Sequence, residues 1–205
     1  MKVLFLLGPS GSGKDTIKNI LIHDYGMNML VPFTTRIQRI NEINGVDYFF
    51  MNEADYQRIK DSGKILEERA YGTVHGLWRY FHCLSEDLEQ SDDTYIAVGT
   101  TEACLSFIEK LGKDSVLPVY IYVDPMTRIR RSLEREASQS KPNVREVCRR
   151  FLSDYEIDYN EEILSRIDNL IFVRNYDMLA CAKNVYKYVI GQESETYILQ
   201  NVGEL

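Results

Sequence analysis

Residues 2–14 read Lys2-Val3-Leu4-Phe5-Leu6-Leu7-Gly8-Pro9-Ser10-Gly11-Ser12-Gly13-Lys14, and this stretch decides the fold of the chain. An apolar run of strand length leads into a glycine-rich loop, and residues 16–25 then carry apolar side chains at helical spacing. In this order the glycines let backbone N–H groups turn inward around an anion, and the helix N-terminus adds partial positive charge. Lys14 then reaches the outer phosphates of a nucleoside triphosphate. We therefore expect residues 8–16 to bind a triphosphate; the alternative is a glycine turn that matches by chance.

The residue after Lys14 departs from the usual phosphate-loop pattern. A Ser or Thr whose hydroxyl ligates magnesium normally stands there, whereas this chain has Asp15, with Thr16 one place later. A carboxylate is a hard-oxygen ligand suited to Mg²⁺, so we expect Asp15 to hold Mg²⁺ directly or through water. The alternative is that Asp15 only favours the helix N-terminus electrostatically.

Composition limits the class of protein. A chain of 205 residues with 44% hydrophobic side chains can bury one well-formed core, so we expect a single domain. The formal net charge of −7 argues against a nucleic-acid partner and favours small anions. The four cysteines are scattered without metal-ligand spacing, which favours reduced thiols in the cytoplasm. The N-terminal apolar run is too short for the core of a signal peptide, and no run of about eighteen apolar residues predicts a membrane span.

Strand-like and helix-like segments alternate along the chain. Apolar runs at residues 3–7, 95–98, 119–123 and 170–173 predict a parallel sheet with crossover helices, which is an α/β fold. Between residues 34 and 80 the short runs broken by glycines predict a small, mostly β insertion with a helix at 52–62 that is capped by Asn52. Asp124-Pro125 opens a further helix, a break follows at 138–143, and a second helix at 144–159 completes a hairpin. A last helix is expected at 176–190.

A second polar cluster follows the glycine loop. Thr34-Thr35-Arg36 is followed by Arg39, Glu42, Gly45, Tyr48 and Phe50. Guanidinium forks bind phosphate oxygens bidentately, the tyrosine hydroxyl adds a donor, and the glutamate can hold an arginine in position. This composition predicts a clamp for a second phosphate; the alternative is a solvated surface turn with ordinary charges.

Together, the two motifs resemble the guanylate kinase family. In that family Gly-Pro-Ser-Gly-x-Gly-Lys is followed by Thr-Thr-Arg-x-x-Arg-x-x-Glu-x-x-Gly-x-x-Tyr-x-Phe, and every fixed residue of the second pattern is present here. The likeness continues through Gly63-Lys64-Ile65-Leu66-Glu67, the arginine-rich hairpin and Asn175, and so covers most of residues 1–190. It implies a divergent, bacterial-type member with a three-layer P-loop kinase fold. One domain at 1–190 would comprise a core (1–31, 94–124, 160–190), a nucleoside monophosphate (NMP)-binding region (32–93) and a lid (125–159), before a tail at 191–205.

The resemblance also assigns roles to residues. The glycine loop from Gly8 to Thr16, with Asn175, would bind ATP, and Lys14 would act in catalysis. The phosphate of the monophosphate would be held by Arg36, Arg39 and Tyr48, with Glu42 supporting the arginines and Tyr80 as a further phosphate contact. Arg36 would also act in catalysis. Glu67 matches the glutamate that reads guanine; the alternative is an ordinary strand carboxylate.

A lid bearing arginines closes on the transferring phosphoryl group in this family. The candidates in this chain are Arg131, Arg135, Arg149 and Arg150, of which we favour Arg135 and Arg150 as catalytic. Positioning and charge neutralisation dominate phosphoryl transfer, so these arginines are expected to affect turnover more than binding. The alternative is that most of them solvate a helix and pair with neighbouring glutamates.

The chain departs from the family pattern in the base pocket. Pro32 replaces a serine that contacts guanine, and the acids of a family Asp-x-Asp motif are absent after residue 96. His82 aligns loosely with a base-contacting hydroxyl, while Tyr71 and Trp78 could stack on a base or simply pack. We expect Mg²⁺-dependent phosphorylation of GMP or dGMP by ATP in the cytoplasm, with no nucleic-acid or membrane partner. The alternatives are a related kinase for another nucleotide or a ribose phosphate, and a non-catalytic partner-binding domain.

Overall fold

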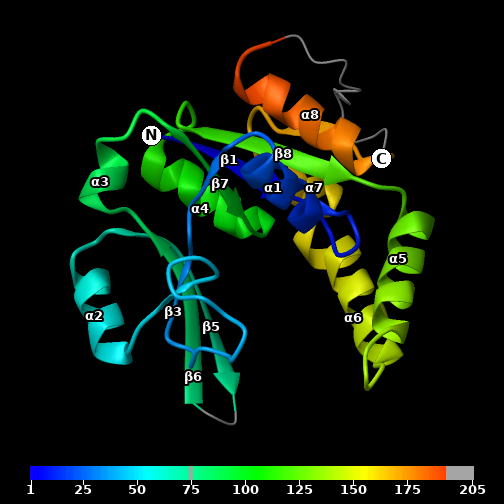
Figure 1. Ribbon diagram of the computed structural model, residues 1–205, viewed down its shortest axis with the longest axis horizontal. Helices are drawn as coiled ribbons and strands as arrows, with labels where there is room; N and C mark the ends of the chain where they lie inside the picture. The colour runs from blue at the N-terminus through cyan, green and yellow to red at the C-terminus, as the bar shows by residue number, and fades with distance from the viewer. Residues whose placement is uncertain (74–75, 193–205) are drawn as a thin grey trace.

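A five-stranded parallel sheet forms the centre of the protein (Figure 1). The structure is a computed structural model that describes residues 1–73 and 76–192. The strand order is β2-β7-β1-β8-β9, and every neighbouring pair is parallel. The strands of this sheet are β1 (Lys2–Leu7), β2 (Asn28–Met29), β7 (Thr94–Val98), β8 (Val116–Tyr122) and β9 (Ile171–Arg174).

Alternate side chains of β1 are buried on opposite faces of the sheet, which accounts for its continuous apolar sequence. Leu4 and Leu6 pack with α1 (Lys14–His23) and α8 (Met178–Val189). On the other face Phe5 packs with α4 (Thr101–Leu111), and α7 (Glu161–Leu164) joins the same cluster. Helices therefore cover both faces of a parallel sheet, and the expected three-layer α/β fold is confirmed.

The segment between β2 and β7 forms a second, smaller sheet. Its strand order is β4-β3-β6-β5, and its core holds Tyr56, Phe81 and Cys83. As expected, Asn52 caps the helix of this insertion, because its side chain accepts a hydrogen bond from the Asp55 backbone N–H. The elements are β3 (Phe33–Thr34), β4 (Phe49–Phe50), α2 (Glu53–Asp61), β5 (Ile65–Thr73), β6 (Gly76–Cys83) and α3 (Glu86–Glu89).

A helical hairpin, α5 (Pro125–Ala137) and α6 (Val144–Ser153), extends from the sheet on the other side of the view from β5 and β6 (Figure 1). The expected single helix at 144–159 is wrong in one respect. The α-helix ends at Ser153 and continues as a π-helical turn, η1 (Asp154–Asp158), in which the Tyr159 N–H donates to the Asp154 carbonyl at 3.0 Å. Hydrogen bonds of this i to i+5 kind have no signature in hydrophobic spacing.

Helix boundaries differ slightly from the expected ones. The first helix begins at Lys14 rather than at residue 16, and the last spans Met178–Val189. Of the expected tail at 191–205, residues 193–205 lie outside the described residues. Within the described part of the chain, no helix combines the length and apolar character that a membrane crossing requires.

Candidate active site

The loop between β1 and α1 requires glycine at two close approaches. Gly11 has φ +80°, and a Cβ there would lie 2.7 Å from the carbonyl oxygen of Arg128 in α5. Gly13 has φ +85°, and its Cβ would lie 2.7 Å from the Asn175 amide nitrogen. The Asn175 amide donates to the Ser12 carbonyl at 2.7 Å. The loop is therefore packed directly against α5 and the end of β9.

Lys14 begins α1 and is partly buried beneath the loop. Burial lowers the pKa of its ammonium group, whereas the nearby carboxylates of Asp15 and Asp154 oppose this shift. The side chain lies 3.5 Å from the Pro9 carbonyl oxygen. Because this contact is long, the ammonium group can readily leave the Pro9 carbonyl and donate to phosphate oxygens.

The π-helical turn and the residue after it contact the glycine loop and the segment after β7. Asp154 is 9% exposed, and its Oδ2 accepts a hydrogen bond from the Ser10 backbone N–H at 2.7 Å. The Tyr159 hydroxyl donates to the Gly99 carbonyl at 3.3 Å. Burial raises the pKa of Tyr159, and a hydrogen bond from the Gly8 backbone N–H opposes that shift. Asp154 therefore binds the glycine loop, while Tyr159, five residues later, binds the segment between β7 and α4.

A cavity of about 370 Å³ lies between the glycine loop and the lid hairpin. Arg135 and Arg150, the two favoured lid arginines, both line it, and so does Arg131, which lies 3.5 Å from the Gly11 carbonyl oxygen. Arg149 is not among the lining residues, and its guanidinium is paired with Glu146, whose carboxylate also accepts from Arg150 Nε at 2.8 Å. We call this the phosphate cavity. It combines Lys14 with three guanidinium groups, which suits a polyanion.

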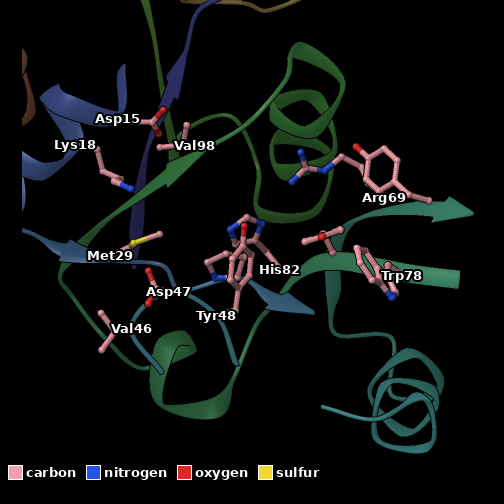
Figure 2. Close-up of a pocket in the computed structure, with 13 residues that line it drawn as sticks. Asp15, Lys18, Met29, Val46, Asp47, Tyr48, Arg69, Trp78, His82 and Val98 are labelled. Atoms are coloured by element: carbon pink, nitrogen blue, oxygen red, sulfur yellow. The ribbon is translucent and has the colours of Figure 1, made fainter. Parts of the chain in front are cut away.

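A second cavity of about 600 Å³ lies between α1 and the small sheet. Asp15 lines both cavities, so the two sites meet at its carboxylate. Figure 2 shows Asp15 and Lys18 at one side of this space and Arg69 and Trp78 at the other. We call it the acceptor cavity. Its lining residues are Asp15, Lys18, Met29, Pro32, Val46, Asp47, Tyr48, Arg69, Tyr71, Trp78, Tyr80, His82 and Val98.

The expected phosphate clamp is assembled around a buried Arg36. Its two Nη atoms donate to the Glu42 carboxylate at 2.7 and 3.0 Å, and its Nε donates to the Tyr80 hydroxyl at 3.1 Å. The rings of Tyr48 and Tyr80 stand edge to face at 5.8 Å, and both tyrosines line the acceptor cavity. The guanidinium of Arg39 is not held by Glu42, contrary to expectation. Glu42 accepts from the Arg39 backbone N–H at 2.8 Å, and the Arg39 side chain is exposed.

Glu67, the expected base-reading residue, is only 5% exposed. Its carboxylate lies 2.8 Å from His82 Nδ1 and 3.2 Å from Arg69 Nε. Burial raises the pKa of Glu67, but the His82 hydrogen bond and the Arg69 charge outweigh it, so the net pKa is lowered and the carboxylate is ionised. Glu67 itself is not a lining residue of the acceptor cavity, whereas His82 and Arg69 are.

Sequence comparison decides the family of this site. The sequence model of guanylate kinase matches residues 1–162, more than half of the chain. This chain belongs to the guanylate kinase family. Two curated guanylate kinases illustrate the distance to relatives. That of the Wolbachia endosymbiont of Brugia malayi is 26% identical over 187 residues, covering 86% of this chain and 93% of the relative. That of Clostridioides difficile is 25% identical over 202 residues, covering 98% and 92%.

A solved structure is similar in fold. The guanylate kinase of Anaplasma phagocytophilum matches with a TM-score of 0.59 at 20% sequence identity, over 98% of this chain and 90% of that one. At this identity the likeness supports the fold alone. The guanylate kinase family and its P-loop kinase fold, both expected from the two motifs, are therefore confirmed.

Sequence reasoning missed several residues of this guanylate kinase-like site, among them Asp154, Arg69 and Lys18. Asp154 was absent from the expectations because a carboxylate in a helix gives no sign that it will reach a loop 144 residues away. Arg69 follows Glu67 by two residues, and strand alternation could have placed both on one face. Lys18 follows Lys14 by one helical turn, a spacing that could have brought it to the same side of α1.

Proposed function

We propose that this protein phosphorylates GMP or dGMP with ATP, as a nucleoside monophosphate kinase of the guanylate kinase family. The observation that carries the proposal is that the phosphate cavity and the acceptor cavity adjoin at Asp15. Direct phosphoryl transfer needs donor and acceptor phosphates in line and in contact. Two adjoining cavities, one lined by Lys14 and arginines and one beside the Arg36 clamp, offer that arrangement.

The chain's own residues would act mainly by position and charge. Backbone N–H groups of the glycine loop and Lys14 would hold the triphosphate, while Arg135 and Arg150 would neutralise charge on the phosphoryl group in transfer. Tyr80 accepts its hydrogen bond from Arg36, which leaves its own hydroxyl proton free to donate to the acceptor phosphate. Closure of the hairpin would exclude water and so protect ATP from hydrolysis.

Mg²⁺ is part of the proposal, with Asp15 as the protein ligand. Among the described residues there is no group of three or more His, Cys, Asp or Glu side chains arranged to hold a metal. That fits Mg²⁺ in a kinase, which commonly takes one or two carboxylates and completes its shell with substrate phosphates and water. When bound, the ion would neutralise phosphate charge.

A further cavity of about 290 Å³ suits the base of ATP. It is lined by Asn175 and Tyr176 after β9 and by Arg130 and Arg131 in α5, and it shares Arg131 with the phosphate cavity. Asn175 already bonds the loop through Ser12, so a base held there would be fixed relative to the phosphates. A cytoplasmic location also belongs to the proposal, supported by four free cysteines, three of them buried.

One observation favours a different acceptor. Pro32 lines the acceptor cavity where the family pattern has a serine, so one polar contact to guanine is missing. A kinase for another monophosphate or a ribose phosphate remains the second candidate for this reason.

The test is a coupled assay of ADP release with ATP, Mg²⁺ and a panel of nucleoside monophosphates and ribose phosphates, with Lys14→Ala as the blank. Turnover confined to GMP and dGMP is the expected result. If turnover is confined to another acceptor, that compound replaces GMP as the proposed substrate. If ATP binds but no acceptor is phosphorylated, the result favours a partner-binding domain. Asp15→Ala should raise the Mg²⁺ concentration needed for half-maximal rate; an unchanged Mg²⁺ dependence would remove Asp15 as the ligand.

A further inference from the structure

Pro32 leaves the acceptor cavity short of a hydrogen-bond donor. Proline has no backbone N–H and no polar side chain, and the Pro32 carbonyl already accepts the Phe49 backbone N–H at 2.9 Å. A purine base that carries an acceptor atom must therefore find its donor on another element of the cavity, since an unpaired polar atom in a closed site costs binding energy.

Arg69 supplies unused donors in that cavity. Because side chains two apart on a strand share a face, Arg69 and Glu67 lie together, whereas Glu68 turns away and accepts from the Tyr56 hydroxyl at 2.6 Å. Arg69 donates to the Glu67 carboxylate through Nε at 3.2 Å and through Nη2 at 3.4 Å. Its Nη1 makes no hydrogen bond or ion pair with any residue in 1–73 or 76–192, and the side chain is 34% exposed at the cavity.

His82 keeps Glu67 in place independently of Arg69. The ring Nδ1 lies 2.8 Å from Oε1 of the carboxylate, and both side chains are almost fully buried. The Glu67 carboxylate is therefore held from two sides, by His82 and by Arg69. Arg69 and His82 line the cavity, and the carboxylate that both contact lies directly behind them.

We propose that Arg69 is a specificity-determining residue that donates to the O6 carbonyl of guanine, beside the Glu67 carboxylate. This inference rests on the proposed function. Guanine presents O6, an acceptor, directly next to N1–H and the N2 amine, which are donors. Arg69 next to Glu67 is the complementary pair. Adenine places an amine at the O6 position, so a donor would face the guanidinium and the base would be rejected.

The experiment compares GMP with two analogues, each of which changes one of the guanine groups at positions 6 and 2. 6-Thio-GMP replaces O6 by sulfur, a weaker acceptor, and IMP lacks the N2 amine while keeping O6. The wild-type protein should prefer GMP over 6-thio-GMP in kcat/KM by about 10-fold or more. Arg69→Ala should lower kcat/KM for GMP and reduce this preference to about 2-fold, while the GMP to IMP ratio is unchanged. Glu67→Gln should instead reduce the GMP to IMP ratio.

Arg58→Ala is the matched control, because Arg58 is an ion-paired arginine of the same insertion that lies outside the acceptor cavity. Arg69→Met, which keeps the alkyl part of the side chain but has no donor, gives the same readout if Arg69→Ala does not fold. An unchanged 6-thio-GMP ratio in both Arg69 variants would overturn the inference while leaving GMP kinase activity intact. Absence of GMP turnover in the wild-type protein would instead refute the proposed function.

Discussion

The carboxylate of Asp154 accepts a hydrogen bond from the backbone N–H of Ser10 at 2.7 Å. This bond joins η1, which follows the α5–α6 hairpin, to the glycine loop. In an α-helix, Asp154 and Tyr159 would point about 140° apart, since five residues exceed one turn of 3.6. The π-helical turn winds more widely, so the two side chains point in more similar directions than they would in an α-helix. Asp154 holds the glycine loop at Ser10, and Tyr159 donates to the Gly99 carbonyl beyond the end of β7.

We predict that Asp154→Ala raises KM for ATP about 10-fold or more with a smaller effect on KM for the acceptor, because the loop loses a hydrogen bond to a charged group. Asp154→Asn keeps an acceptor oxygen and should therefore raise KM for ATP much less. Steady-state kinetics with each substrate varied in turn would measure this. Asp158→Asn is the control, since Asp158 bonds Ser153 and not the loop. Equal rises in both KM values would refute a role specific to the loop.

Removal of a lid arginine should slow turnover more than it weakens binding. Arg135 and Arg150 line the phosphate cavity, so we expect Arg135→Ala or Arg150→Ala to lower kcat about 10²-fold or more, with KM for the acceptor little changed. Arg149→Ala should retain most activity, because Arg149 shares Glu146 with Arg150 but does not line the phosphate cavity. Comparable turnover after replacing Arg135 and Arg150 together would contradict the assignment.

The Arg36–Glu42 pair predicts a pH dependence of stability. Hydrogen bonds from the Arg36 guanidinium and from the Arg39 backbone N–H lower the pKa of Glu42 from 4.5 to about 2. A carboxyl group with a depressed folded-state pKa stabilises the protein above its unfolded pKa and loses this effect as pH falls through the folded value. Glu42→Gln should therefore unfold at a lower urea concentration than the wild type at pH 7. This difference should shrink as the pH falls from about 4.5 to about 2, where it should vanish.

Glu146 provides the control for that titration. Its pKa is also lowered to about 2, by Arg149 and Arg150, but all three side chains are exposed on the lid. Solvent screens such pairs, so Glu146→Gln should shift the urea midpoint less than Glu42→Gln at every pH. A larger shift for Glu146→Gln would mean that the buried position of Arg36 does not matter.

One of the four thiols should be much more reactive than the others. Burial raises the pKa of Cys83 to about 11 and those of Cys104 and Cys181 to about 12, whereas Cys148 is exposed on α6. A disulfide-exchange reagent should modify one thiol rapidly in the native protein and four after denaturation. Cys148→Ser should abolish the rapid phase; a remaining rapid phase would show that a buried cysteine becomes accessible.

The sequence predicted those parts of the fold whose signal is local. The run at 3–7, the loop glycines and the Asn52 cap each act through neighbouring residues, and the resulting elements lie close to where they were expected. The π-helical turn escaped prediction because its hydrogen bonds differ from those of an α-helix by one residue, while its side-chain pattern does not.

Within the site, motif spacing placed the clamp residues near one another, and the geometry between them came only from the structure. Nothing in the spacing showed that Glu42 would hold the Arg39 backbone rather than its guanidinium, or that Glu67 would lie behind Arg69 and His82. The contact between Glu67 and His82 depends on the pairing of β5 with β6, which joins these residues 15 positions apart, whereas the Glu42 contact depends on the local turn between Arg39 and Glu42.

The π-helical turn also bears on which changes this region can accept. Side-chain exchanges at exposed positions such as Tyr155 leave the turn in register. Loss of a single residue within η1 would restore ordinary winding and rotate the lid hairpin relative to the loop by roughly a quarter of a turn or more. We expect chain length across residues 154–158 to be constrained more tightly than amino-acid identity, so that the number of residues there works as a spacer.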